Sequence, residues 1–236
     1  MINNDWTQDE QDLLVLLAKR GKKQAAIAKE LGRTERAVNS QIYRLRKGGK
    51  LKHWLDYEHA IILDVETTDF SADIGIMLSW AIKPVGGKVI SDVITREELF
   101  NGQLDRRICR SLVAELEKAD AVITYFGTGF DNVFLRTRCL ILGIDFPAYG
   151  TIYHYDVYYT AKSKLKLHSK RLDSVAKALG CESQKSPVDI SVWQKARWGD
   201  KNALGYVLEH NELDVCVLEE VYNKLRDFVK VTRKSI

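Results

Sequence analysis

The feature that most constrains this chain is an apolar run over residues 61–68 that two acids, Asp64 and Glu66, interrupt. Its β-branched residues predict a buried strand, and the period-two alternation of a strand places both acids on the same side. Two neighbouring anions in a buried strand repel each other and lose their hydration. A cation between them would offset both costs, so we expect this pair to bind metal.

The sequence around this strand predicts a sheet with flanking helices. Apolar segments bounded by turn residues predict further strands over residues 76–82, 89–94, 121–126 and 152–158. Helical periodicity predicts helices over residues 107–118 and 172–179, the second closed by Gly180, and a long last helix. Residues 181–200 contain a Ser186-Pro187 break, and for them we expect a loop or an insertion.

A third acid, Asp131, lies where a strand turns into a helix. Residues 127–131 lead from the expected strand into a helix that ends near Gly143. An acid at a helix start is explained equally well by capping, which is worth about 1 kcal/mol. Asp131 alone therefore does not indicate a site.

The last helix carries a possible base and a further acid. Its core-facing apolar stripe is interrupted by a single polar residue, Asn211. Beside the stripe, His210 and Asp214 are four residues apart and share one face, so a base and a metal ligand can meet one substrate there. A His/Asp pair on a solvated surface explains the same spacing, so this interpretation depends on the other acids.

The N-terminal fifth of the chain predicts three short helices. A capping box over residues 7–10 begins the first, Gly32 stops the second, and the third follows Thr34. Their apolar residues can close one small core: Trp6, Leu14, Leu17, Ile27, Leu31, Val38, Ile42 and Leu45. The outer face of the third helix then holds polar and basic residues: Arg36, Asn39, Ser40, Tyr43, Arg44 and Lys47.

Positive charge is concentrated in this part of the chain. Residues 1–56 hold 12 Lys and Arg against 7 Asp and Glu, whereas residues 57–236 hold 24 against 25. The whole surplus behind the net charge of +4 therefore lies in the N-terminal part. This division favours a phosphate-rich partner for that part.

Residues 3–48 resemble the Myb/SANT-like helix-turn-helix modules. The resemblance rests on Asp5-Trp6-Thr7, Ile27-Ala28, Leu31-Gly32-Arg33-Thr34, Ala37-Val38 and Arg44-Leu45. In such modules the third helix enters the major groove, so the resemblance implies that the six residues of the outer face contact DNA. SANT-like modules also bind proteins, but the basic third helix favours nucleic acid, and DNA in preference to RNA. We expect this module to occupy residues 1–50.

Three motifs together resemble those of the DEDD superfamily of 3′ to 5′ exonucleases. They are Asp64-Val65-Glu66-Thr67, residues 125–131, and His210-Asn211-Glu212-Leu213-Asp214, in the order and spacing of that family. Residues 172–180 are also similar to a helix of family B polymerase proofreading domains and YprB-like nucleases. The likeness spans residues 58–226. It implies an α/β fold of the RNase H-like type, a mixed five-stranded sheet flanked by helices, which we expect over residues 57–230.

The resemblance also implies the chemistry of the site. It implies two divalent ions, Mg²⁺ or Mn²⁺, about 4 Å apart, one activating water and one stabilising the leaving oxygen. Hard oxygen ligands favour these ions over zinc. The implied ligands are Asp64, which bridges the ions, together with Glu66, Asp131 and Asp214.

The third motif departs from the family pattern. The family has a tyrosine with three residues before the aspartate, or a histidine with four, and here His210 stands at the tyrosine spacing. One helical turn still separates His210 from Asp214, so we expect His210 to be the general base. Tyr206, two turns from Asp214, is the alternative.

These features predict a metal-dependent 3′ to 5′ exonuclease of DNA or RNA that its N-terminal module targets. Two alternatives remain open: a DNA-binding regulator with an idle nuclease fold, and a structure-specific endonuclease. No apolar run approaches the ~18 residues that cross a bilayer, so we expect no membrane partner. The four cysteines match neither a zinc pattern nor a disulfide framework, which favours a cytoplasmic protein.

Overall fold

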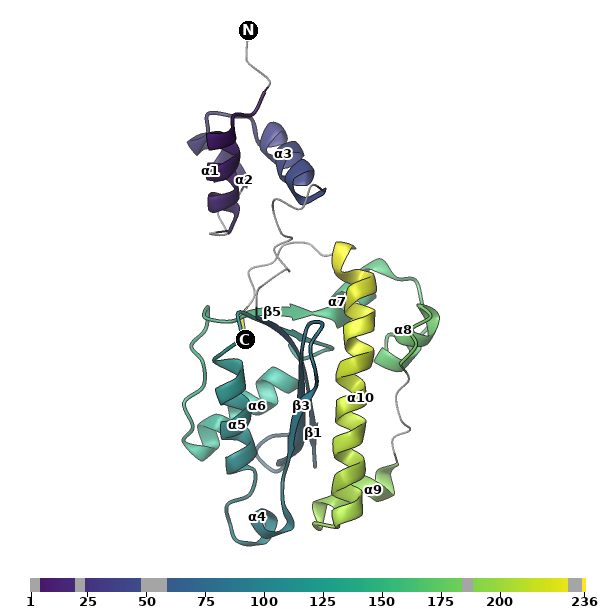
Figure 1. The fold of residues 1–236 in the computed structure, drawn as a ribbon. Coiled ribbons are helices and arrows are strands. Elements are labelled where there is room, and N and C mark those ends of the chain that lie inside the picture. Colours follow the sequence, from purple (N-terminus) through teal and green to yellow (C-terminus); the bar gives the residue numbers. More distant parts are fainter. Residues whose placement is uncertain (1–4, 20–23, 48–58, 184–188, 229–234) are drawn as a thin grey trace. The chain divides into compact units, whose positions relative to one another are not determined.

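The computed structural model divides the chain into two compact units, Met1–Asp56 and Tyr57–Ile236. The structure describes residues 5–19, 24–47, 59–183, 189–228 and 235–236. Figure 1 shows helices alone in the first unit and a sheet flanked by helices in the second. None of the helices in these ranges combines the length and the apolarity that a membrane crossing needs.

The first unit contains the three predicted helices, α1 (Gln8–Lys19), α2 (Gln24–Glu30) and α3 (Glu35–Lys47). The capping box forms as expected, because the Thr7 amide donates to Glu10 Oε2 at 2.9 Å and the Glu10 amide donates to Thr7 Oγ1 at 3.2 Å. Glu10 also accepts from Arg33 Nε at 3.0 Å, and that guanidinium lies 5.1 Å from the Trp6 ring centroid. One small core holds the helices together: Leu14, Leu17, Ile27, Ala28, Val38, Ile42 and Leu45.

The second unit is built on the expected mixed five-stranded sheet, in the order β3-β2-β1-β4-β5. Antiparallel pairs join β1 (Ala60–Thr67) to β2 (Met77–Pro84) and β2 to β3 (Ile90–Val93). Parallel pairs join β1 to β4 (Ala121–Thr124) and β4 to β5 (Tyr153–Asp156). The predicted RNase H-like arrangement is therefore confirmed, with β1 at its centre.

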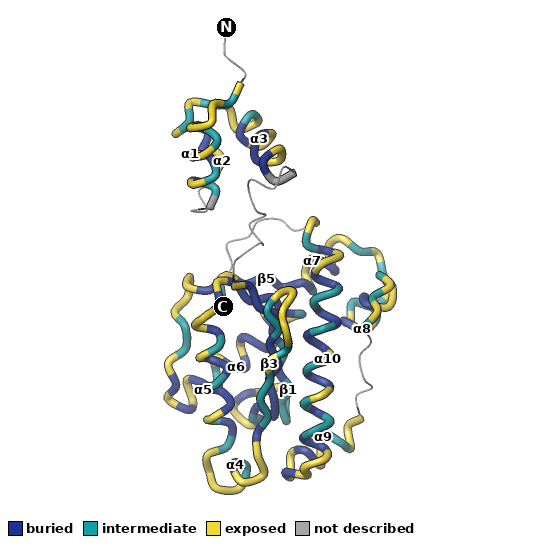
Figure 2. Tube along the Cα trace, viewed as in Figure 1, coloured by how far each residue is buried: buried dark blue, intermediate teal, exposed yellow. Residues whose placement is uncertain are grey.

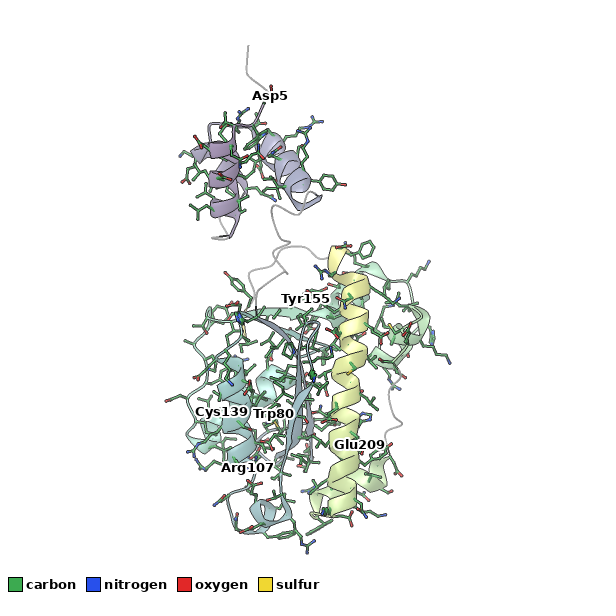
Figure 3. The ribbon with its side chains drawn as sticks, viewed as in Figure 1. Asp5, Trp80, Arg107, Cys139, Tyr155 and Glu209 are labelled. Carbon is green, nitrogen blue, oxygen red and sulfur yellow. The ribbon has the colours of Figure 1, made fainter. Side chains whose placement is uncertain are left out.

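Helices cover both faces of this sheet (Figure 1), and the central strands between them are largely buried (Figure 2). One face packs against α5 (Arg106–Leu116) and α6 (Asp131–Leu142), and the other packs against α10 (Lys201–Leu225). Leu63 and Val65 belong to the core on the α5 side. Trp80, the cross-strand partner of Val65, lies on the same side and donates its indole N–H to Ser111 Oγ at 3.1 Å (Figure 3). Because side chains alternate along a strand, Asp64 and Glu66 face α10.

Two sequence expectations need correction. The strand expected over residues 152–158 ends at Asp156, whose carboxylate caps the N-terminus of α7 (Val157–Lys164) by accepting from the Tyr158 amide at 3.1 Å. The region expected as a loop or an insertion, residues 181–200, is not a loop throughout, because it contains α9 (Ile190–Arg197), which packs on α10. The remaining short elements are α4 (Arg96–Phe100), α8 (Leu172–Ala178) and the 3-10 turn Arg226–Phe228.

The turn between β4 and α6 is tightly constrained. Phe126 adopts a left-handed conformation with φ of 71°, which is rare for a residue with a bulky side chain. A Cβ atom at Gly127 would lie 2.3 Å from Thr124 Oγ1, and one at Gly129 would lie 2.4 Å from Phe126 Cζ. The buried Thr124 leaves no room for a side chain at Gly127, so this turn delivers Asp131 to a fixed place.

A matched pair of glycine substitutions tests this constraint. Gly127→Ala should lower the free energy of unfolding by about 2 kcal/mol or more, because the fully buried Thr124 cannot move away from the new methyl group. Gly205→Ala should leave stability unchanged or raise it by up to about 1 kcal/mol, because Gly205 lies inside α10 with open space around it. Urea unfolding of both variants gives the measurement, and equal effects would contradict the constraint.

Candidate metal centre

Three elements bring acidic side chains together beside the exposed end of β1. Asp64 and Glu66 come from β1, Asp131 from the first residue of α6, and Asp214 from the middle of α10. The parallel pairing of β1 with β4 covers only residues 60–62, so the later part of β1 has a free edge on that side. Asp131 fills this edge, because its Oδ1 accepts a hydrogen bond from the Val65 amide at 3.2 Å.

Asp131 is a buried carboxylate and not a helix cap. Its side chain is 3% exposed, and the helix cap position belongs to Phe130. Burial raises the pKa of Asp131 from its usual 3.8 to about 7, although hydrogen bonds from its own amide and the Val65 amide favour the charged form. The charges of Asp156 and Asp214 raise this pKa further, which places Asp214 in the same electrostatic cluster.

His210 lies inside the cluster. It is 2% exposed, and its Nε2 lies 3.7 Å from Glu66 Oε1 and 3.7 Å from Asp214 Oδ2. One donor atom from each of these three residues lies within 4.8 Å of the other two. His210 and Asp214 are therefore not a solvated surface pair, and the structure gathers all five expected site residues into one region.

A comparison with known protein families identifies the superfamily of this chain. Residues 61–226 match the family described as the RNase_H superfamily. This chain belongs to the RNase H superfamily.

Structural similarity supports the same fold for this RNase H superfamily protein. Among solved structures, the family B DNA polymerase from the hyperthermophilic archaeon Pyrobaculum calidifontis is similar, with a TM-score of 0.59 and 20% sequence identity. The match covers 72% of this chain and 25% of the polymerase chain. At this identity the likeness shows the fold alone. No curated protein sequence gives a significant match.

Asn211 is a site residue whose role the sequence did not reveal. Its Nδ2 donates to Asp64 Oδ2 at 2.6 Å across the interface between α10 and β1. The side chain is fully buried, so this hydrogen bond fixes the orientation of the Asp64 carboxylate. The only sequence signal was a polar residue within an apolar stripe.

Trp193 of α9 covers the cluster from a second direction. Its Nε1 donates to Glu66 Oε2 at 3.3 Å, and its ring stands nearly perpendicular to the His210 ring, with centroids 5.2 Å apart. The ring of Tyr206, the alternative base, packs against the same indole at 6.3 Å. Residues 181–200 were expected to form a loop or an insertion, and no pattern in them pointed to a hydrogen bond between Trp193 and Glu66.

A further buried acid, Asp156, supports the turn that carries Asp131. Its carboxylate oxygens accept from the Phe126 amide at 2.8 Å and the Thr128 amide at 3.0 Å. Together with the Tyr158 amide, these donors occupy the carboxylate fully enough to explain its burial. Asp156 therefore positions the turn, and its charge reaches Asp131.

The donor set fits a divalent cation. Four carboxylates and one imidazole offer hard oxygen atoms and one nitrogen atom, a combination suited to Mg²⁺ or Mn²⁺. Within the described part of the chain, two buried polar atoms beside the acids have no hydrogen-bond partner: Asn211 Oδ1 and the hydroxyl of Ser79, which pairs with Glu66 across β1 and β2. Buried polar atoms are rarely left unsatisfied, so the cluster is suited to a hydrated ion.

The nucleic-acid face predicted for α3 is exposed. The structure places on the surface all five of its described side chains: Arg36, Asn39, Ser40, Tyr43 and Arg44. Tyr43 is 68% exposed, although an aromatic ring of this size usually packs against a neighbour. The sixth residue, Lys47, ends α3, and its side chain lies outside the described residues.

Substitution of Asp131 tests whether burial and the neighbouring carboxylates destabilise its charged form. A carboxyl group whose pKa rises to about 7 on folding holds its proton more tightly in the folded state, so it costs stability as the pH rises from about 4 through 7. Asp131→Asn keeps an acceptor for the Val65 amide but carries no charge. In EDTA at pH 8 it should be more stable than wild type by on the order of 2 kcal/mol, with little difference at pH 4.

Thermal unfolding at the two pH values gives this measurement. Glu117→Gln, which neutralises an exposed acid at the end of α5, should show no such pH-dependent gain. If the stability of wild type and of Asp131→Asn changed with pH in the same way, the expected cost of the charged Asp131 would be contradicted.

Proposed function

We propose that this protein is a divalent-metal-dependent 3′ to 5′ exonuclease that hydrolyses the phosphodiester bonds of nucleic acid. The observation that carries the proposal is the convergence of four acids from distant segments on one place in an RNase H superfamily fold. A phosphodiester is anionic, and attack on it builds more negative charge. Carboxylates alone would repel it, so this cluster suits such a substrate only together with cations.

The residues of the cluster would have different roles. Asp64, Glu66 and Asp214 would hold one ion, and Asp64 and Asp131 would hold the other. When bound, the ions supply charge that activates water and stabilises the leaving oxygen. Asn211 would keep the Asp64 carboxylate in its orientation. Trp193 would hold Glu66 and limit the access of bulk water to it.

A mostly apolar pocket between the segment after β1 and the start of α6 supports action at a chain end. It has a volume of about 300 Å³ and is lined in part by Phe70, Ala72, Phe130 and Phe134. Phe70 is 89% exposed and meets Phe130 edge to face, with ring centroids 6.0 Å apart. Aromatic faces stack on unpaired bases of any sequence, so this pocket suits the terminal base of a single strand.

The N-terminal unit would supply binding to DNA. Its α3 surface presents Arg36 and Arg44 with polar neighbours, a composition that neutralises phosphates and contacts base edges. A protein-binding role is the alternative for a three-helix unit of this kind. The basic charge of residues 1–56 favours DNA.

A digestion assay tests the activity. With Mn²⁺, 5′-labelled single-stranded DNA should shorten stepwise, and Asp64→Asn should lower the rate by at least about 100-fold, because charge stabilisation worth several kcal/mol is lost. Asp145→Asn, which changes an exposed acid after α6, should cleave like wild type.

Circular single-stranded DNA and the Asp64→Asn variant separate the alternatives. The circle should stay intact, because an exonuclease needs a free end; its cleavage would indicate an endonuclease. An uncut linear strand, or cutting that Asp64→Asn leaves unchanged, would contradict the proposal and favour a DNA-binding regulator.

A second assay tests the N-terminal unit. The double variant Arg36→Ala/Arg44→Ala should bind duplex DNA more weakly and reduce the slope of log affinity against log salt by about 1 per lost phosphate contact. Lys29→Ala removes an exposed positive charge from α2 instead of α3 and should bind like wild type. Fluorescence anisotropy gives both quantities, and wild-type binding by the double variant would favour a protein partner instead.

A further inference from the structure

The position of the His210 imidazole suggests a role other than proton transfer. Its Nε2 is one corner of a triangle whose other corners are Glu66 Oε1 and Asp214 Oδ2, each 3.7 Å away. Both distances exceed those of a hydrogen bond, which is about 2.7–3.2 Å between nitrogen and oxygen. Neither contact therefore fixes the imidazole as a hydrogen-bond donor to these two oxygens.

The same spacing suits three donors around one ion. Two donors about 2.1 Å from an ion, at an angle of roughly 90–110°, lie about 3.0–3.4 Å apart. The observed separations are larger by only a few tenths of an ångström, an adjustment within the range of side-chain rotation. The three donor atoms also lie within 4.8 Å of one another, so small side-chain rotations can bring all of them to a single ion.

The surroundings of the ring hold it in this place. Residues 210 and 214 are one turn apart on α10, which sets the ring directly beside the Asp214 carboxylate. On its other side, the Trp193 ring packs against it at 89°. The imidazole is also shorter than the phenol of a tyrosine, so from this helical position it ends among the carboxylates instead of reaching past them.

We propose that His210 is a metal ligand, which joins Glu66 and Asp214 around the first of the two ions, and that this nitrogen donor makes that site prefer Mn²⁺ to Mg²⁺. Imidazole is a ligand of first-row transition ions, whereas Mg²⁺ takes oxygen donors almost entirely. A ligated Nε2 has its lone pair committed to the ion, so His210 is not the group that accepts a proton from water. This inference rests on the proposed metal centre but not on the direction or substrate of cleavage.

A competing explanation makes the imidazole a counter-ion. A protonated His210 between two carboxylates would balance their charge and would have no bond to a metal. The two explanations differ in one observable property, because only a ligated imidazole couples its nitrogen nucleus to the unpaired electrons of Mn²⁺.

Pulsed electron paramagnetic resonance of the full chain with one equivalent of Mn²⁺ measures this coupling. Wild type should show ¹⁴N modulation from a directly bound imidazole, and His210→Gln should lose it while still binding Mn²⁺. His168→Gln, which changes an exposed histidine after α7, should keep the signal. Three results would each overturn the inference: absence of Mn²⁺ binding, bound Mn²⁺ without nitrogen coupling in wild type, or unchanged coupling in His210→Gln.

Calorimetric titration gives an independent readout that does not depend on one variant. His210→Gln and His210→Tyr should weaken Mn²⁺ binding by at least about tenfold and Mg²⁺ binding by much less. Circular dichroism checks that both variants fold, and an unchanged ratio of Mn²⁺ to Mg²⁺ affinity in the folded variants would contradict the proposal. Nuclease assays test the proposed activity separately. Cleavage without nitrogen coupling would contradict only the ligation by His210, and nitrogen coupling without cleavage would contradict only the exonuclease activity.

Discussion

Repulsion between buried carboxylates is the constraint around which the larger unit is arranged. Negative charges interact more strongly where water is excluded, so a cluster that includes Asp131 and Asp214 is costly without positive charge nearby. Three neutral groups donate hydrogen bonds to the cluster: the Val65 amide, the Asn211 amide and the Trp193 indole. Each fixes a carboxylate oxygen without cancelling its charge, and the affinity for a cation is preserved.

Two buried acids elsewhere in the same unit are paired with arginine side chains. Asp105 is fully buried and receives two hydrogen bonds from the Arg138 guanidinium, at 2.6 and 2.8 Å. Glu98 is likewise bound by Arg107 Nε at 2.6 Å. A guanidinium neutralises its partner and would compete with a metal for it. Asp105 and Glu98 are thus acids whose charge an arginine balances within the fold.

The sequence predicted those parts of the structure that local patterns determine. Alternation along β1 placed Asp64 and Glu66 on one face, and the glycine-rich turn placed Asp131 at a helix start, as found. Periodicity shows which residues share a helix face but not what covers that face. Only the packing of α9 on α10 therefore excludes the alternative in which His210 lies on a solvated surface. The contact of Trp193 with Glu66 joins segments with no local signal in common.

The separation of the site's two halves along the polypeptide determines when the site can first exist. Asp64 and Asn211 are 147 residues apart, and Glu66 and Trp193 are 127 apart. During translation β1 leaves the ribosome long before α10, although the N-terminal helices can already close their own small core. A nascent chain beside its messenger RNA therefore lacks an assembled ion cluster, and any capacity to degrade nucleic acid must wait until α10 has been synthesised.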